Sequence, residues 1–381
     1  MTLDVHEDVI TTVARAATGS PGATCGRWRI EPSPHRVENM TTDRLDRVVG
    51  ELDDGTTWSV FAKTLHPASA SPMWQHIPPE HHAAVLEDLH WLDEPRLYGC
   101  GLAERLPDGI RMPALLHVSE GHAGEGPGSE GHGVVTLWLE DVADEGAWDL
   151  DRYHRSARAL GRLGGRWPEE RAMAELGIGR RPIERLWFGK LTHLDLVLQA
   201  DDAFWEDPAV ASVVDDRHRA DLERLRDAVP GLLARLSALP HGLAHGDATP
   251  DNLREPGDGT VVAIDWSYGS SAALGSDLGQ LLAGRVESGV GHALDPGELP
   301  AVGAAIVDGY LEGLASEGCE ADRAAVEEAW ATNLAVRSVF SALILDHRPD
   351  LGGADRQDLL ARRAALGRFG LDLALRVLAT T

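Results

Sequence analysis

Three polar residues in the second half of the chain have the types and spacing of a phosphoryl-transfer site. The segment LAHGDATPDNL contains Asp247 and Asn252, and Asp265 follows the apolar run VVAI. Transfer of a phosphoryl group to a hydroxyl needs a carboxylate that accepts the hydroxyl proton. It also needs an amide and a second carboxylate to hold Mg²⁺ on the nucleotide phosphates. A tight loop turned at Pro250 would present Asp247 and Asn252 together, with Asp265 opposite them.

Two other interpretations use the same residues. Asp and Asn side chains often accept hydrogen bonds from backbone amides in turns, so the pattern has a purely structural explanation. That explanation leaves three oxygen-bearing side chains close together in an otherwise helical half of the chain, and we therefore favour chemistry. A metal-dependent hydrolase built on His245, Asp247 and Asp265 is a further alternative, and it would need no lysine elsewhere.

The elements that position these residues differ between the two halves of the chain. In the second half, helical periodicity dominates, as in the series Leu222, Leu225, Val229, Leu232 and Leu236. Two short β-like segments surround the Asp247 loop, and residues 164 to 182 are irregular enough for a loop insertion. The expected architecture there is a helical domain that carries one polar loop.

The first half is expected to be mainly β-sheet. A short helix over residues 5–17 ends at Gly19, and β-type runs extend from 35 to 65 with a hairpin signal at 53–55. A second hairpin is predicted from MPALLHVSE and HGVVTLWLED, which flank a loop at about 120 to 132. The GxGxxG sequence within that loop precedes a strand instead of opening a helix, so we reject it as a phosphate-binding loop.

Length and charge limit the possible classes of protein. The 381 residues exceed the usual size of one core, and 43% hydrophobic with 25% charged residues is typical of globular proteins. The net charge of −26 disfavours nucleic acid as a partner and would concentrate cationic small molecules. No apolar run is long enough to cross a membrane, and we expect a cytoplasmic protein. Three widely separated cysteines predict neither disulfides nor a metal site.

The run LAHGDATPDNL with VVAIDW resembles the catalytic and metal-binding segments of the aminoglycoside phosphotransferase and choline kinase families, relatives of the protein kinases. The resemblance implies that Asp247 is the catalytic base and that Asn252 and Asp265 are Mg²⁺ ligands, with ATP as the phosphoryl donor. His245 would then organise the loop backbone. Asp277 would brace the same loop, although a plain helix cap is an equally good account.

The resemblance also assigns nucleotide-binding residues in the first half of the chain. Lys63, one of only two lysines, lies in the strand TTWSVFAKTL, where the families place the lysine that contacts the α- and β-phosphates. Its partner would be a helical glutamate, for which we prefer Glu94, because WLDEPRLYG resembles a family pattern in which Trp, Glu and Tyr open that helix. Glu87 is the rival, because Pro95 fits the first turn of a helix but not its middle. The run LWLEDV resembles the hinge that contacts adenine.

The turn between the first two strands, at about 39 to 43, departs from the kinase pattern because it contains no glycine. Thr41 and Thr42 are the residues there that offer hydroxyl and amide donors to phosphates. The charge of Asp43 opposes that role.

These observations predict an α+β, protein-kinase-like fold with two lobes. The N-terminal nucleotide-binding lobe is expected over residues 1–138, a hinge over 139–144 and a helical lobe with the acceptor site over 145–381. The predicted activity is ATP- and Mg²⁺-dependent transfer of the γ-phosphoryl group to a hydroxyl of a small molecule, such as an aminoglycoside or amino sugar. Other acceptors, namely sugars, choline-like alcohols and peptide antibiotics, stay open, as does a nucleotide-binding pseudokinase.

Overall fold

The computed structural model of the chain describes residues 6–33, 37, 39–122, 133–181, 183–288, 294–345 and 353–380. The glycine-rich sequence at 126–131 therefore lies outside the described residues. The chain forms two compact units, and each unit consists of two segments that alternate with those of the other along the sequence. The first consists of Met1–Ala103 and Met112–Ala143, and the second of Glu104–Arg111 and Asp144–Thr381.

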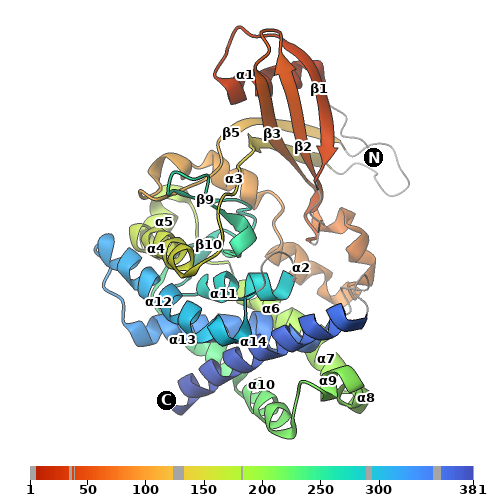
Figure 1. Cartoon of the computed structure of the whole chain (residues 1–381), viewed down its shortest axis with the longest axis vertical. Coiled ribbons are helices and arrows are strands. Elements are labelled where there is room, and N and C mark those ends of the chain that lie inside the picture. Colours follow the sequence, from red (N-terminus) through yellow and green to blue (C-terminus); the bar gives the residue numbers. More distant parts are fainter. Residues whose placement is uncertain are drawn as a thin grey trace. The chain divides into compact units, whose positions relative to one another are not determined.

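The first unit is built around an antiparallel sheet with the strand order β1-β2-β3-β6-β5 (Figure 1). Its strands are β1 (Cys25–Pro32), β2 (Thr42–Leu52), β3 (Thr57–Leu65), β5 (Leu115–His122) and β6 (Gly133–Glu140). Its helices are α1 (Glu7–Thr18), α2 (His82–Asp88) and α3 (Asp93–Gly99), with short 3₁₀ turns at Ala68–Ala70, Pro72–His76 and Pro79–His81. Both predicted hairpins are confirmed, because β2 pairs with β3 and β5 pairs with β6.

Helix α1 supplies the apolar layer on one face of this sheet. Ile10, Val13 and Ala14 pack with buried strand residues that include Val60 and Ala62. Alternate residues of a strand point to opposite faces, so Lys63 lies on the face away from α1. The predicted leading helix is confirmed, and it ends where Gly19 adopts the left-handed conformation with φ of 65°. Lys63 shares that second face with the buried apolar residues Leu65 and Leu137.

The second unit is mainly helical, with short strands near its centre. Its helices between β4 (Ile110–Arg111) and β7 (His241–Ala244) are α4 (Leu150–Arg166), α5 (Glu169–Leu176), α6 (Ile183–Lys190), α7 (Leu196–Gln199), α8 (Asp202–Glu206), α9 (Pro208–Ala211) and α10 (Asp216–Leu236). The later helices are α11 (Leu278–Ser288), α12 (Leu299–Ser316), α13 (Arg323–Leu334) and α14 (Gly353–Ala379). Wider π-helical turns occupy Leu191–Asp195 and Ala335–Val339, and 3₁₀ turns occupy Ala103–Arg105, Pro250–Asn252, Pro296–Glu298 and Ser341–Leu343.

The short strands form two small sheets, β10-β7 and β4-β9-β8. They are β4 (Ile110–Arg111), β7 (His241–Ala244), β8 (Leu253–Arg254), β9 (Val261–Ala263) and β10 (Ser270–Ala273). Strand β4 runs parallel to β9, whereas the other pairs are antiparallel. The loop that contains Asp247 starts at the end of β7, so these sheets hold the predicted catalytic segment.

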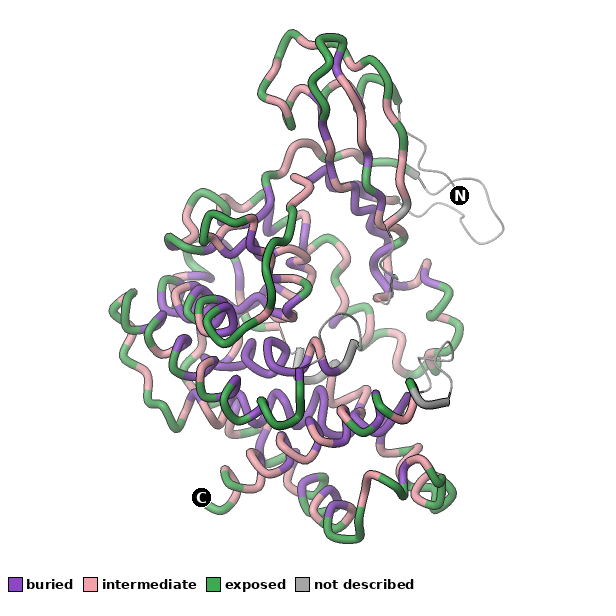
Figure 2. Tube along the Cα trace, viewed as in Figure 1, coloured by how far each residue is buried: buried purple, intermediate pink, exposed green. Residues whose placement is uncertain are grey.

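Buried leucines hold the helices of the second unit together. The predicted series on α10 is buried, and Leu222 and Leu225 pack with Val339 and Leu371 in one cluster. Figure 2 shows buried positions along the helices of this unit. The expectation of a loop insertion from 164 to 182 was wrong. Helix α4 continues to Arg166, and the run EERAMAEL forms α5, which Gly177 ends in the left-handed conformation. The short helix escaped notice because it has only two buried residues, Ala172 and Leu176.

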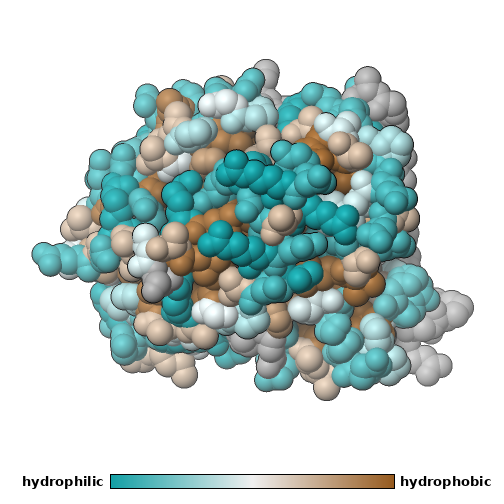
Figure 3. Space-filling view, turned by 90° about the horizontal axis from the view of Figure 1, so that it is seen from below, coloured by the Kyte–Doolittle hydropathy of each residue, from teal (hydrophilic) through white to brown (hydrophobic). Residues whose placement is uncertain are grey.

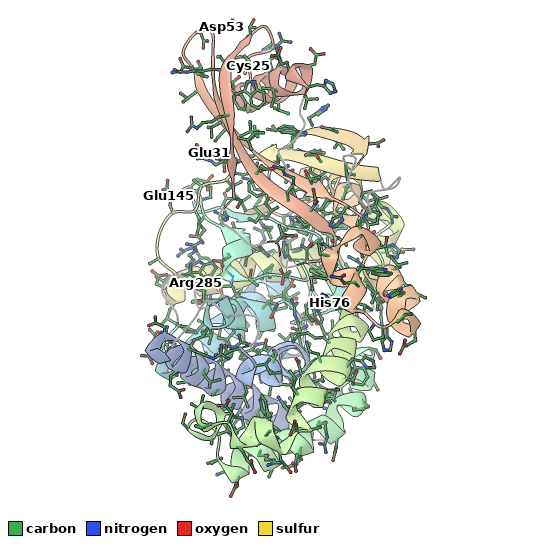
Figure 4. The ribbon with its side chains drawn as sticks, turned by 90° about the vertical axis from the view of Figure 1, so that its right-hand side faces the viewer. Cys25, Glu31, Asp53, His76, Glu145 and Arg285 are labelled. Atoms are coloured by element: carbon green, nitrogen blue, oxygen red, sulfur yellow. The ribbon has the colours of Figure 1, made fainter. Side chains whose placement is uncertain are left out.

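The cysteines are free and partly buried, as expected for a chain without disulfides. Figure 4 shows Cys25 near Asp53 at one end of the first unit. Burial, followed by the negative charge of Asp53, raises the pKa of the Cys25 thiol. Burial also raises the pKa of Cys319. Neither environment activates the sulfur, because the thiolate is the reactive form.

The surface is largely hydrophilic on the face that Figure 3 draws. Figure 3 shows hydrophilic residues over most of one face, interrupted by separate apolar patches. Among the described helices, none is long and apolar enough to span a membrane.

Candidate active site

The loop after β7 brings Asp247 and Asn252 into direct contact. The Asn252 side-chain Nδ2 donates to the Asp247 carbonyl at 2.9 Å and to Asp247 Oδ2 at 3.1 Å. The 3₁₀ turn at Pro250–Asn252 allows this approach, because Pro250 fixes the first residue of the turn. Both bonds use the nitrogen of the amide, and no donor among the described residues bonds to Asn252 Oδ1. That oxygen is therefore directed elsewhere and has the chemistry of a metal ligand.

Asp265 reaches the same region through the pairing of β8 with β9. Ile264, its neighbour, donates its amide to the Asn252 carbonyl at 2.9 Å. Asp265 has φ of 60°, the only positive value among the described non-glycine residues. Such a conformation costs about 1–3 kcal/mol and is most common at functional sites. Its Oδ1 accepts a hydrogen bond from Ser267 Oγ at 2.7 Å. The structure thus joins Asp247 to Asn252 by side-chain bonds and brings Asp265 next to them through the backbone bond of Ile264 to Asn252.

His245 connects the loop to the strand end and serves as a structural residue. Its Nε2 donates to the Ile264 carbonyl at 2.9 Å, and its Nδ1 accepts from the Asp247 amide at 3.3 Å. A carbonyl only accepts and an amide only donates, so these partners select the neutral ring with its proton on Nε2. The ring also packs against Trp266, with the ring centroids 4.8 Å apart. Both nitrogens are engaged, which argues against a hydrolase that uses His245.

Asp277 braces the loop from the start of α11. Its Oδ2 accepts from the His245 amide at 2.9 Å, and its Oδ1 accepts from the Gly246 amide at 2.8 Å. These contacts agree with the bracing role and not with a plain helix cap. Burial raises the pKa of the Asp277 carboxyl, against the opposing effect of the hydrogen bonds from the two amides.

Gly246 lets the loop pass close to a neighbouring segment. Its φ of 81° is unfavourable for residues with a side chain, and a Cβ there would lie 2.3 Å from the Tyr268 carbonyl oxygen. The phenol of Tyr268 faces the same region, and burial together with the charge of Asp247 raises its pKa to about 12. Tyr268 is therefore neutral near physiological pH.

In the first unit, Lys63 is paired with Glu94. The Lys63 Nζ lies 2.7 Å from Glu94 Oε2, with side-chain exposures of only 4% and 1%. Glu94 belongs to the first turn of α3, which also contains Pro95, as the sequence predicted. Glu87 is exposed on α2, so the structure selects Glu94 as the partner. A buried lysine paired with a buried carboxylate has the chemistry of a fixed phosphate-binding cation.

Thr41 and Thr42 have less to offer a phosphate than the sequence suggested. Their amides both donate to Asn39 Oδ1, at 3.1 and 2.7 Å, and both residues are buried. The Asn39 side chain thus closes the turn locally, as asparagine often does. The amides are occupied in this conformation, and the Thr42 hydroxyl is buried.

No family model and no curated protein sequence matches the chain. Among solved structures, an aminoglycoside phosphotransferase from Alicyclobacillus acidocaldarius has 15% sequence identity and a TM-score of 0.54, covering 100% of this chain and 98% of its own. The chain has the protein-kinase-like fold. An amicoumacin kinase in complex with AMP-PNP and Ca²⁺ is 13% identical, with a TM-score of 0.49 and 96% of both chains covered. A spectinomycin phosphotransferase in complex with ADP is 11% identical, with a TM-score of 0.48 and 94% of both covered.

Within this kinase-like fold, one residue at the Asp247 loop was missed from the sequence. Arg337, on the π-helical turn Ala335–Val339, donates to Asp247 Oδ1 at 2.9 Å and to the Gly246 carbonyl at 2.8 Å. It lies 90 residues beyond Asp247 in an apolar stretch, AVRSVF. The isolated cation in that stretch was the available signal, because a buried arginine needs a partner.

Proposed function

We propose that the chain is an ATP-dependent phosphotransferase that acts on a hydroxyl of a small molecule. The fold supports this proposal, and the observation that carries it is the contact of Asp247 with Asn252 beside the strand end that holds Asp265. Asp247, Asn252 and Asp265 have the types and the chain order expected for a phosphoryl-transfer site. The contact of the first two and the backbone bond beside the third support a shared role.

In this proposal Asp247 is the general base. Its carboxylate aligns the acceptor hydroxyl and takes the proton as the oxygen attacks the γ-phosphorus, while ADP leaves. Carboxylates only accept hydrogen bonds, and each oxygen keeps lone pairs beyond the donor that it already has. Asn252 and Arg337 fix the carboxylate without consuming that capacity.

The residues present also fit Mg²⁺. This ion takes oxygen ligands, commonly one or two protein groups together with phosphate oxygens and water. The side-chain oxygen of Asn252 and the carboxylate of Asp265 would hold it, which agrees with the use of Asn252 Nδ2 for hydrogen bonds to Asp247. When bound, the ion would neutralise charge on the nucleotide phosphates.

Lys63 is proposed to contact the α- and β-phosphates of ATP. Glu94 holds its ammonium group in place, and the surrounding sheet keeps both charges away from solvent. We retain Thr41 and Thr42 as proposed phosphate contacts only through a rearrangement of the Asn39 turn, because Asn39 now occupies their amides.

The acceptor is proposed to be an aminoglycoside or another amino sugar. The net charge of −26 favours the approach of cationic molecules. The cytoplasm, which holds Mg·ATP, is the proposed location.

The test is ADP release from Mg·ATP by the purified chain with a panel of amino sugars, plain sugars, choline-like alcohols and peptide antibiotics. We expect stimulation by at least one acceptor, with transfer of ³²P from the γ-position to that acceptor. The matched variant Asp258→Asn, in an exposed turn of the same segment, serves as the control for Asp247→Asn. Nucleotide binding without ADP release would instead support a pseudokinase, and absence of both would overturn the proposal.

A further inference from the structure

Arg337 lies against Asp247 although it belongs to a distant part of the sequence. Its side chain is only 5% exposed, and it bonds to both the carboxylate of Asp247 and the carbonyl of Gly246. One guanidinium thus holds the backbone and the side chain of the same loop. We infer that Arg337 is a positioning residue for the transfer reaction and acts by orienting the Asp247 carboxylate, an inference that rests on the proposed function.

The first argument is that the carboxylate is held at both oxygens. Arg337 Nη2 donates to Oδ1 of Asp247 at 2.9 Å, and Asn252 Nδ2 donates to Oδ2 at 3.1 Å. The two donors come from different elements, so rotation of the carboxylate breaks at least one bond. Charge-assisted bonds of this kind are short and strong, which makes the arginine the firmer of the two.

The second argument is that Arg337 is itself fixed by neighbours. Gln280, on α11, has its amide beside the guanidinium, which can only donate. With its oxygen on that side, Gln280 accepts from Arg337 Nε at 3.1 Å and from Nη2 at 2.5 Å. The centre of the guanidinium also lies 4.2 Å from the centroid of the Trp187 ring, within the range of a cation–π contact.

The third argument comes from the backbone that carries Arg337. The turn Ala335–Val339 is π-helical and follows α13 directly, and all five of its residues are buried. π-helical turns are rare and are often found at functional sites. Here the turn supplies the only charged residue within AVRSVF, and that residue points to the proposed base.

A structural role and a positioning role are separable by kinetics. In ADP release from Mg·ATP, with water as acceptor or with any acceptor found active, we expect Arg337→Ala to lower kcat by about 100-fold and to change the KM for ATP by less than about twofold. Millimolar guanidinium should restore part of kcat, whereas equal NaCl should not.

The matched control is Arg363→Ala. Arg363 is also a buried arginine of the second unit, and it donates to the carbonyls of Ser341 and Ala342. We expect this variant to lower the melting temperature without the selective loss of kcat and without rescue. The inference is overturned if Arg337→Ala keeps its kcat. It is also overturned if Arg337→Ala resembles Arg363→Ala in kcat, in melting temperature and in its response to guanidinium.

A double-mutant cycle decides the inference even if the proposed function fails. In urea unfolding, Arg337→Gln and Asp247→Asn should be non-additive, with a coupling of more than about threefold in the unfolding equilibrium constant. In an active enzyme, Arg337→Gln should also have little further effect on kcat in the Asp247→Asn background. A wild-type chain without ADP release refutes the proposed function, whereas additive unfolding constants refute the role of Arg337.

Discussion

The ammonium group of Lys63 lies 2.7 Å from the Glu94 carboxylate, and both side chains are almost completely buried. A buried charge that loses its partner is costly, whereas an apolar pair of similar volume is often tolerated. An apolar pair could therefore replace Lys63 and Glu94 without a large loss of stability, whereas nucleotide binding needs the charge of Lys63. Substitutions can thus separate the effect on stability from the effect on catalysis.

We predict that Lys63→Met or Glu94→Leu alone lowers the free energy of unfolding by about 3–5 kcal/mol, as measured in urea. The double variant should recover most of that loss but should not recover ADP release. Lys190→Met is the control, because Lys190 pairs with Asp195 at 3.1 Å outside the proposed site. A double variant with wild-type turnover would show that Lys63 has no role in nucleotide binding.

Removal of the proposed base should affect the chemical step. We predict that Asp247→Asn lowers kcat by about 10²- to 10⁴-fold while ATP binding, measured by calorimetry, is retained. The amide is nearly the same size as the carboxylate, so the loop should keep its shape. Wild-type kcat in this variant would remove Asp247 from the reaction.

Asp265 has a positive φ and is also a proposed metal ligand, and two substitutions distinguish these properties. Asn tolerates positive φ, so Asp265→Asn should fold normally yet need at least about tenfold more Mg²⁺ for half-maximal ADP release. Asp265→Val should instead lower the free energy of unfolding by about 1–3 kcal/mol through backbone strain. An unchanged Mg²⁺ requirement in Asp265→Asn would contradict the assignment.

Gly246 and Gly55 offer a matched pair for testing the loop. Both have positive φ, but a Cβ would meet the Tyr268 carbonyl at 2.3 Å in Gly246 and nothing within 4 Å in Gly55. We predict that Gly55→Ala costs about 1–2 kcal/mol from backbone conformation alone. Gly246→Ala should cost more and should also lower kcat. Equal losses in thermal unfolding would show that the close approach is unimportant.

Buried tyrosines should make the protein sensitive to alkali. Burial raises the pKa of Tyr153 and of Tyr268 to about 12, and that of Tyr310 further still. Between about pH 10 and 12 the unfolded chain loses protons that the folded chain keeps, so the free energy of unfolding should fall as pH rises. Tyrosinate absorbance should show at least three of the four tyrosines neutral at about pH 11 in the folded protein. Ionisation of three near pH 10 would contradict this environment.

The parts of the fold that local sequence specifies were predicted well. The hairpin at 53–55 follows from turn chemistry, and the resemblance of WLDEPRLYG to a family pattern that opens a helix led to Glu94, which lies in the first turn of α3. The polar loop was located because Asp247 and Asn252 are close in sequence and their contact needs only one tight turn.

The parts of the fold and of the site that depend on tertiary packing were not predicted. Strand β1 at the edge of the sheet was also missed, although Trp28 and Ile30 alternate with arginine and glutamate in the pattern of a half-buried strand. The role of Arg337 depends on a π-helical turn packed against a loop 90 residues earlier, which no local pattern specifies. The hydrogen bonds from the Thr41 and Thr42 amides likewise depend on the orientation of the Asn39 side chain, which accepts both.

Residues Glu104–Arg111 belong to the second unit although residues on both sides of them belong to the first. Their strand β4 pairs with β9, which follows about 150 residues later, so it stays without its neighbour on the ribosome until most of the polypeptide has been made. The chain passes between the units after Ala103, after Arg111 and after Ala143. A single protease cut at any one of these passages would give two fragments, and at least one of them would still contain segments of both units.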